Sequence, residues 1–389
     1  MKVRVEGTGG SEGWPVPGCA CASCGRLDPG HRRPASILVD QRVRLAPSRQ
    51  PSEAGPATAS DIATGPDAPA GPHPGVEEGL PEGYRLLRTS DGREVTAPEG
   101  GRLLYAVGPP SRHGEPGDGP PPDSPFDVVL IDLPDRPERL GDLRRRGRVT
   151  PSTRIIAVNL CHRVPSEGEL ARRLGFWGAE AVPDGTVIGT ASTPITDGPS
   201  EATGGRPRRT LLLGGSRSGK SEEAELRLAA EPEVTYVATG PSGGDDPDWL
   251  ARVRTHRERR PAHWRTVETT DLAAVLSGGR GTFLVDGIGT WLAAVFDESG
   301  AWPGDTRPDD LRRLALDQVE ERCEALVDAW RGARARVVAV SDETGLGVVP
   351  ATAAGRLFRD ALGRLNQALA RESEEVALVV AGRVVPLPI

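Results

Sequence analysis

The chain has 389 residues, a net charge of −7 and a pI of about 5.6, and its length predicts two domains. Hydrophobic residues make up 37%, which is enough to form the core of a soluble protein. No stretch approaches the roughly 20 apolar residues of a membrane span, and the first seven residues lack the apolar region of a secretory signal. Aromatic residues make up only 4% and are not interleaved with a basic stripe, so we expect a cytoplasmic protein that does not bind nucleic acid.

The N-terminal half contains short strands separated by two low-complexity segments. Residues 47–81 and 108–124 are rich in proline and glycine and have too few large apolar side chains to offset the entropy of ordering, so we expect disorder there. A helix is expected at 166–174, with Ser166 as its N-cap and Glu169 at the capping-box position. Strands are expected at 36–40, 103–107, 127–132 and 154–158.

Three of the five cysteines lie together. Cys19, Cys21 and Cys24 form a C-x-C-x-x-C cluster, while Cys161 and Cys323 stand alone. In a reducing compartment a disulfide framework is improbable, and such a cluster more often binds a metal ion.

A polar stretch, residues 191–208, is expected to link a domain of residues 1–190 to a domain of residues 209–389. In the second domain strands alternate with helices, a pattern typical of an α/β fold with a parallel sheet and right-handed crossovers. The expected strands are 210–213, 234–238, 282–285, 336–340 and, as the last one, 376–380; the expected helices are 221–230, 248–259, 288–296, 309–330 and 353–371.

Residues 214–221 fit the phosphate-binding pattern G-x-x-x-x-G-K-S, directly after an apolar strand and at the start of a helix. The glycines let backbone N–H groups point at a phosphate, and the helix dipole adds positive potential there. Lys220 is one of two lysines in an arginine-rich chain. We expect it to reach the β- and γ-phosphates while Ser221 ligates Mg²⁺; the alternative is an ordinary glycine-rich turn. The predicted nucleotide-binding residues here are Gly214, Gly215, Ser216, Arg217, Ser218, Gly219, Lys220 and Ser221.

The segments around this P-loop resemble one enzyme family. The chain reads L-L-L-G-G-S-R-S-G-K-S at 211–221, V-T-Y-V-A-T-G at 234–240, R-V-R-T-H-R-E-R-R-P-A-H-W-R-T-V-E at 252–268, V-S-D-E-T-G-L-G-V-V-P at 340–350 and R-L-F-R-D-A-L-G-R-L-N-Q-A-L-A at 356–370. Together these are similar to the bifunctional adenosylcobinamide kinase / adenosylcobinamide-phosphate guanylyltransferase family of cobalamin biosynthesis. The resemblance covers residues 209–389 and implies a RecA-like P-loop fold.

The resemblance also implies an activity. Members of the family phosphorylate adenosylcobinamide with a nucleoside triphosphate, ATP or GTP, and then transfer GMP from GTP to that phosphate through a guanylylated histidine. That histidine falls on His256, with Mg²⁺ as the metal ion and a homotrimer as the assembly. By the same resemblance, residues 340–350 and 356–367 shape the corrinoid end of the site. The further nucleotide contacts implied are Ala238, Thr239, Gly240, Arg257, Glu258, Arg259, Arg260, Glu268 and Asp286.

The residue chemistry agrees with His256 but leaves alternatives open. A nucleophilic imidazole needs cations nearby, which lower its pKa and neutralise charge that develops on the α-phosphate, and His256 lies in an arginine-dense segment. That segment could instead be a solvated helix face, and His263 is a rival nucleophile. Asp286, at a strand end, is a candidate for the acidic Walker-B position or a simple turn residue. Asn366 and Gln367 could be plain helix-surface amides.

The N-terminal half resembles a metallo-β-lactamase-fold phosphodiesterase at residues 7–24, 33–40, 126–132 and 154–162. This superfamily holds its catalytic metals with H-x-H-x-D-H, but none of the six histidines of this chain have that spacing, and the segment expected to carry it falls in residues 47–81. Asn159 stands where a metal-binding histidine would be expected. We therefore expect a degenerate, hydrolytically inactive α/β domain.

In the phosphodiesterases that the N-terminal half resembles, such a cysteine cluster and a distant histidine hold a structural zinc ion. The positions here are Cys19, Cys21, Cys24 and His162, a ligand set suited to tetrahedral Zn²⁺. His31 is an alternative fourth ligand, and three unligated thiols are the other possibility. For the whole chain, the alternatives to a corrinoid kinase and guanylyltransferase are a nucleotide-binding scaffold or sensor and, less favoured, a metal-dependent phosphodiesterase.

Overall fold

The computed structural model describes residues 1–47, 80–108, 125–189, 206–240, 254, 260–304 and 308–388. It divides into two compact units, Met1–Gly198 and Pro199–Ile389, which are described separately. Most of the two predicted low-complexity segments and of the predicted linker, and nearly all of the helix expected at 248–259, lie outside the described residues. None of the described helices combines the length and the apolar character that crossing a bilayer requires.

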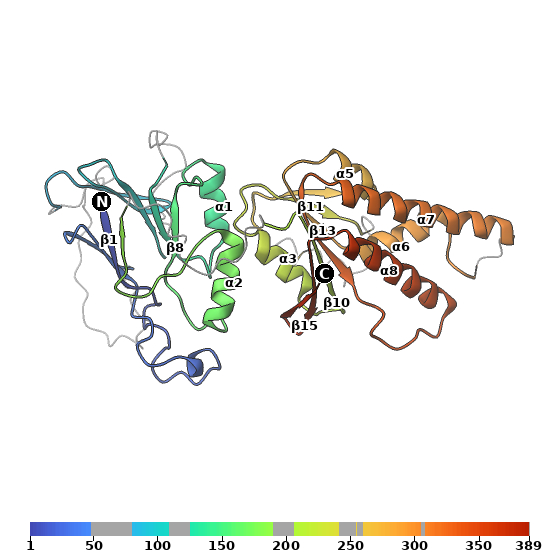
Figure 1. The fold of residues 1–389 in the computed structure, drawn as a ribbon, viewed down its shortest axis with the longest axis horizontal. Helices are drawn as coiled ribbons and strands as arrows, with labels where there is room; N and C mark the ends of the chain where they lie inside the picture. The colour runs from blue at the N-terminus through green and yellow to red at the C-terminus, as the bar shows by residue number, and fades with distance from the viewer. Residues whose placement is uncertain are drawn as a thin grey trace, which may run out of the picture. The chain divides into compact units, whose positions relative to one another are not determined.

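The N-terminal unit is built on two sheets (Figure 1). One has the strand order β3-β2-β1-β9, and the other has the order β4-β5-β6-β7-β8. The strands are β1 (Lys2–Gly7), β2 (Ser36–Val39), β3 (Val43–Leu45), β4 (Arg85–Thr89), β5 (Gly92–Thr96), β6 (Arg102–Ala106), β7 (Val128–Ile131), β8 (Arg154–Ala157) and β9 (Val187–Gly189); the helices are the short 3-10 helix η1 (Cys24–Arg26), α1 (Glu138–Arg145) and α2 (Glu167–Trp177).

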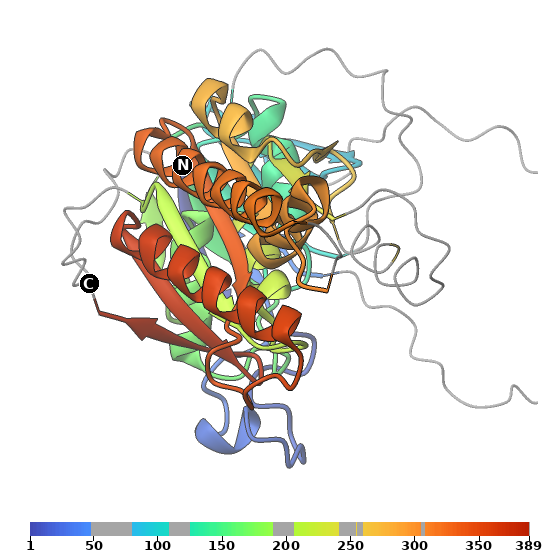
Figure 2. The same ribbon diagram turned by 90° about the vertical axis from the view of Figure 1, so that its right-hand side faces the viewer.

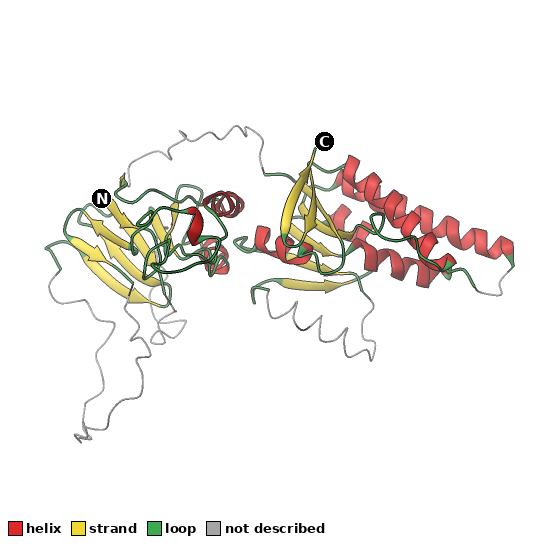
Figure 3. Cartoon of the chain, turned by 90° about the horizontal axis from the view of Figure 1, so that it is seen from below, coloured by secondary structure: helices red, strands yellow, loops and turns green. Residues whose placement is uncertain are grey.

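The core of this unit lies between the two sheets. Alternate side chains of β1 and β2, such as Val3 and Ile37, pack with Leu103, Tyr105 and Leu130 from the other sheet. Figure 3 shows the two layers of strands, with α1 and α2 along one outer side.

The predicted cap of α2 is confirmed. The Ser166 side chain accepts a hydrogen bond from the backbone N–H of Glu169, which satisfies one of the free donors at the helix start.

The C-terminal unit is a seven-stranded sheet in the order β12-β11-β13-β14-β10-β15-β16. All neighbouring strands are parallel except β15 and β16, which pair antiparallel. The strands are β10 (Arg209–Gly214), β11 (Thr235–Ala238), β12 (Arg265–Glu268), β13 (Thr282–Asp286), β14 (Arg336–Asp342), β15 (Glu375–Val380) and β16 (Arg383–Leu387); the helices are α3 (Lys220–Leu228), α5 (Leu272–Gly278), α6 (Ile288–Ser299), α7 (Asp309–Gly332) and α8 (Ala353–Arg371).

Helices cover both faces of this sheet, so its central strands are apolar on both sides. Alternate residues of β10 divide between the faces: Leu211 and Leu213 pack with α5 to α8, and Leu212 packs with Ala224 and Leu228 of α3. Figure 1 shows α3 on one side of the sheet and α5 to α8 on the other, and Figure 2 shows α7 and α8 side by side.

The sequence prediction of this unit needs correction at its edges. The strand at 376–380 is not the last one, because β16 returns antiparallel beside it, so the sheet is mixed rather than purely parallel. The strand β12 and the helix α5 were not expected from the sequence. Both edge strands are largely exposed. The strand β12 has no apolar run. The short apolar run of β16 contains Pro386, a residue found in sheets mainly at their edges.

Candidate functional site

The P-loop connects β10 to α3 at the carboxyl edge of the parallel strands. Arg217 and Gly219 both have a positive φ, 57° and 96°, which curls the loop before the helix begins at Lys220. The loop is held from outside by the turn between β15 and β16, where the N–H of Gly382 donates to the Ser218 carbonyl at 2.8 Å. A Cβ at Gly214 would lie 2.7 Å from the Val379 carbonyl oxygen, so only glycine fits this approach.

The Lys220 ammonium lies over this loop. Its Nζ donates to the carbonyl of Gly215 at 3.1 Å and forms an ion pair with Asp342 Oδ1 at 2.7 Å. Asp342 ends β14, the direct neighbour of β10, and is paired with Gly214 in the strand register. Sequence reasoning did not single out Asp342. Its position at the end of a predicted strand was the available signal, because carboxyl ends of parallel strands meet at one edge.

Asp286 ends β13, the strand beside β14, and it lies next to Ser221 of the first turn of α3. The Ser221 hydroxyl donates to Asp286 Oδ1 at 3.3 Å, and the Tyr236 hydroxyl donates to Asp286 Oδ2 at 2.6 Å. Burial, and then the adjacent Asp286 carboxylate, raise the pKa of Tyr236 well above its usual value, so the phenol remains a donor. A hydroxyl and a carboxylate beside a P-loop are the hard oxygen ligands that Mg²⁺ prefers, so this pair fits the predicted ion.

Arg260, the last residue of the arginine-rich segment, lies against Tyr236. Its guanidinium carbon lies 3.5 Å from the centroid of the Tyr236 ring, a close cation–π contact. The predicted nucleophile His256 and the predicted contacts Arg257, Glu258 and Arg259 lie outside the described residues.

The remaining predicted nucleotide contacts end neighbouring strands. Ala238 and Glu268 are paired in register at the ends of β11 and β12, and Thr239 and Gly240 follow Ala238. The Thr239 side chain is buried; its hydroxyl donates to the Gly287 carbonyl at 2.7 Å and lies 2.9 Å from the Thr290 hydroxyl. It therefore ties two loops together, and its side chain already has partners within the protein.

Two other sequence candidates bond to the protein's own backbone, one at the opposite edge of the sheet and one at the end of β14. His263 precedes β12, at the amino edge of the sheet, where its Nε2 lies 3.3 Å from the Glu231 carbonyl. Asn366 is buried on α8 rather than exposed: it accepts from the Ser341 hydroxyl at 2.6 Å and donates to the Asp342 carbonyl at 3.1 Å. The surface-amide interpretation of Asn366 is therefore wrong, and the residue fixes the end of β14.

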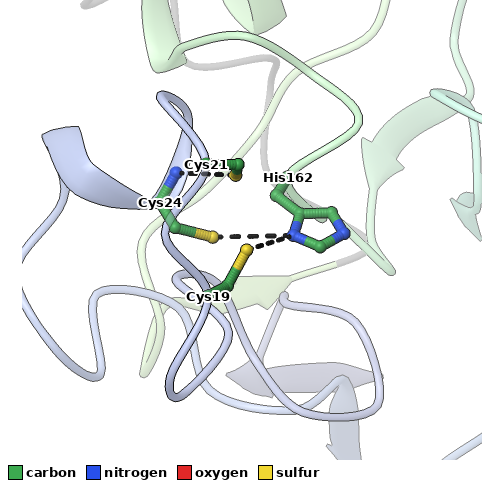
Figure 4. A group of neighbouring side chains, drawn as sticks. All are labelled: Cys19, Cys21, Cys24 and His162. Carbon is green, nitrogen blue, oxygen red and sulfur yellow. Dashed lines mark hydrogen bonds between the residues drawn. The ribbon is translucent and has the colours of Figure 1, made fainter.

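The N-terminal unit brings its cysteine cluster to a histidine 138 residues beyond Cys24 (Figure 4). The ligand atoms of Cys19, Cys21, Cys24 and His162 all lie within 4.8 Å of one another. His162 Nδ1 is 3.3 Å from the sulfur of Cys19 and 3.6 Å from that of Cys24. The Cys24 N–H lowers the pKa of the Cys21 thiol, whereas burial raises the pKa of the Cys24 thiol.

These distances suit zinc. Zn–S bonds of about 2.3 Å and Zn–N bonds of about 2.0 Å at tetrahedral angles place sulfur and nitrogen about 3.6 Å apart. His31 lies elsewhere, with its Nε2 3.0 Å from Glu167 Oε1. Asn159 has a positive φ of 60°, and His73 and His113 lie outside the described residues.

Comparison with known proteins finds a family that the C-terminal unit resembles. A sequence model described as cobinamide kinase / cobinamide phosphate guanyltransferase matches residues 210–387. The bifunctional adenosylcobalamin biosynthesis protein CobU of Escherichia coli is 37% identical over 177 residues, which are 44% of this chain and 95% of that protein. The bifunctional adenosylcobalamin biosynthesis protein CobP of Pseudomonas aeruginosa is 42% identical over 186 residues, which are 46% of this chain and 96% of that protein.

Proposed function

Through residues 210–387 the chain belongs to the cobinamide kinase / cobinamide phosphate guanyltransferase family, and from this premise we propose that it phosphorylates adenosylcobinamide and then transfers GMP to the product. The observation that carries the proposal is the P-loop edge, where Lys220 lies over curled backbone and Ser221 meets Asp286. These groups suit a triphosphate bound with Mg²⁺, and an Mg²⁺ ion supplies charge neutralisation between phosphate oxygens.

In the first reaction the chain binds and orients a nucleoside triphosphate. The P-loop amides and Lys220 hold the β- and γ-phosphates, and Ser221 and Asp286 would hold Mg²⁺. The corrinoid hydroxyl oxygen bonds to the γ-phosphorus as the bridging oxygen leaves with the nucleoside diphosphate, and the hydroxyl proton is released to solvent. Because phosphoryl transfer needs little covalent help, positioning by these residues supplies most of the catalysis.

In the second reaction His256 is the nucleophile. Its unprotonated nitrogen attacks the α-phosphorus of GTP, pyrophosphate leaves, and a guanylylated histidine forms. The phosphate of adenosylcobinamide phosphate then displaces the histidine and yields adenosylcobinamide-GDP. Two in-line displacements replace one difficult transfer. The location of His263 at the opposite edge of the sheet favours His256 over its rival.

The overall function is tested by incubating the protein with labelled GTP, adenosylcobinamide and Mg²⁺ and identifying the corrinoid products. Adenosylcobinamide-GDP is the expected product. A protein that binds GTP but forms neither corrinoid phosphate nor the GDP derivative would instead be a nucleotide-binding scaffold or sensor, and the proposal would be wrong.

The nucleophile is tested by covalent labelling with GTP that carries the label on its α-phosphate. His256→Ala is expected to abolish retention of GMP on the protein, while His263→Ala keeps it. Full labelling of the His256 variant would remove that residue from the mechanism.

For the N-terminal unit we propose a hydrolytically inactive domain of metallo-β-lactamase type that is held together by one Zn²⁺ ion. The three thiols and the imidazole of Cys19, Cys21, Cys24 and His162 support the zinc site, because this ligand set leaves no open position for a substrate. Such a site would fasten the loop at residues 19–24 to the loop after β8, contributing to folding rather than to catalysis.

The zinc site is tested by metal analysis of the purified full chain. One zinc ion per chain is expected, with His162→Ala lowering the content and His31→Ala leaving it unchanged. A folded chain without zinc would contradict the proposal. The expected homotrimer stays a prediction, which the mass of the assembly in solution would check.

A further inference from the structure

Asp342 lies between the strands that lead to the phosphate loop and to the proposed magnesium ligand. Its strand, β14, has β10 on one side and β13 on the other. Gly214 of the P-loop pairs with Asp342 in register, and Asp286 pairs with Val340, two residues earlier. The end of β14 therefore borders the space in which the γ-phosphate and its Mg²⁺ would be bound.

The backbone and the carboxylate of Asp342 are both held in place. Its carbonyl accepts from the Asn366 side chain, and the next N–H along the chain, that of Glu343, donates to the Gly214 carbonyl at 3.1 Å. Asp342 Oδ2 lies against the first turn of α6, where a Cβ added to Gly289 would be only 2.6 Å from it. The carboxylate is therefore positioned by the protein's own packing.

The same carboxylate remains accessible to a substrate. Within the described part of the chain, its side-chain oxygens have one polar partner, the Lys220 ammonium. The Asp342 side chain is 41% exposed, and the loop that follows it exposes the apolar side chains of Leu346, Val348 and Val349. An open polar group beside an apolar surface suits a large corrinoid that presents a hydroxyl.

Lys220 relates this carboxylate to the γ-phosphate. Its Nζ lies 2.7 Å from Asp342 Oδ1. A γ-phosphate oxygen bonded to the same ammonium would lie at most about 5.6 Å from Oδ1, because charge-assisted N–H···O bonds are about 2.7–2.9 Å long. A hydroxyl oxygen fits in that gap, about 2.6–3.2 Å from the carboxylate and about 3–3.5 Å from the phosphorus.

We propose that Asp342 is the general base of the phosphorylation reaction: its carboxylate accepts the proton of the adenosylcobinamide hydroxyl as that oxygen bonds to the γ-phosphorus. This inference rests on the function proposed above. The β–γ bridging oxygen leaves with the nucleoside diphosphate, and the protonated Asp342 then releases the proton to solvent. GMP transfer needs no such base, because the attacking phosphate oxygen has already lost its proton at neutral pH.

The test compares the two reactions in Asp342→Asn at saturating GTP, Mg²⁺ and corrinoid, so that changes in affinity do not enter. One assay follows phosphorylation of adenosylcobinamide, and the other follows GMP transfer from GTP to adenosylcobinamide phosphate supplied as substrate. Phosphorylation is expected to slow by about 100-fold, the lower end of the range for general-base catalysis, because positioning supplies most of the rate. The rate of GMP transfer is expected to stay unchanged, which also shows that the variant is folded.

Asp328→Asn is the matched control, because it removes an ion pair of the same 2.7 Å length from the surface of α7 and should keep both rates. Unchanged phosphorylation by Asp342→Asn overturns the inference. Equal slowing of both reactions also overturns it, since the carboxylate would then act only through Lys220, which binds GTP in both. Where Asp342→Asn does not fold, the smaller Asp342→Ala takes its place in the same comparison.

The wild-type chain separates this inference from the function on which it rests. A wild type that forms no adenosylcobinamide phosphate overturns both. A wild type that forms it, together with an Asp342→Asn variant that is equally fast, overturns the role of Asp342 alone.

Discussion

Asp342→Asn is expected to tighten the binding of Mg·GTP. The Asp342 carboxylate holds the Lys220 ammonium at 2.7 Å, and a phosphate that binds at the P-loop must share that cation with it. The pair is neither buried nor fully solvated, since the side chains are 14% exposed for Lys220 and 41% for Asp342. Because water screens half-exposed pairs, we assign it about 0.5–1 kcal/mol.

That free energy corresponds to a roughly 2- to 5-fold lower dissociation constant for the variant. Asparagine keeps the shape of the side chain, so the hydrogen bond that the Asp342 carbonyl accepts from Asn366 remains. Titration of the protein with a fluorescent GTP analogue at fixed Mg²⁺ measures the change. Glu343→Gln is the matched control, because that side chain accepts from the Gly345 N–H and has no bond to Lys220 among the contacts described. Weaker or unchanged binding by Asp342→Asn would refute the idea that the carboxylate competes with phosphate.

Two further predictions concern stability. Gly214→Ala should lower the free energy of unfolding of the C-terminal unit by about 1–3 kcal/mol, because the new methyl group would lie 2.7 Å from the Val379 carbonyl. In Gly215→Ala, where an added Cβ meets no atom within 4 Å, the thermal unfolding temperature should barely change, and equal losses in the two variants would contradict the packing argument. Burial raises the pKa of Glu167, but the two bonds from Arg32 outweigh it and hold that pKa below 4.5. The stability from this pair is therefore present above pH 4.5 and lost as the pH falls through the lowered pKa. Glu167→Gln should accordingly make the free energy of unfolding of the N-terminal unit, measured with urea, fall less steeply as the pH is lowered. A fall as steep as that of the wild type would show that this carboxylate is not its source.

Much of the C-terminal fold was predictable because the apolar pattern of each central strand agrees with the burial of that strand in the sheet. The run of Leu211, Leu212 and Leu213 is apolar because helices cover both faces of β10, and the following glycines signal the loop. The edge strand β12 gave no such signal. In β12, Arg265 and its neighbours are mostly exposed, so no burial pattern was imposed on the sequence.

The site was most directly predictable where its residues are contiguous, although Asp286 was also expected from its place at a strand end. The P-loop reads directly from eight consecutive residues, whereas the pairing of Lys220 with Asp342 depends on β14 lying beside β10. The ring of Tyr236 under Arg260 is likewise a matter of strand order and packing. In the N-terminal unit the spacing of three cysteines indicated a metal site and the resemblance offered His162 as the fourth ligand, and the fold brings His162 rather than the alternative His31 to the cysteines.

The hydrogen bond from Gly382 to Ser218 has a consequence for the synthesis of the protein on the ribosome. The ribosome makes Ser218 about 160 residues before Gly382, which at ordinary elongation rates is a delay of roughly 10–30 s. Throughout that interval the phosphate loop lacks the turn that supports it from behind, and β10 lacks its neighbour β15. Nascent chains should therefore be unable to capture GTP until the final hairpin has left the exit tunnel, however early the motif itself is translated.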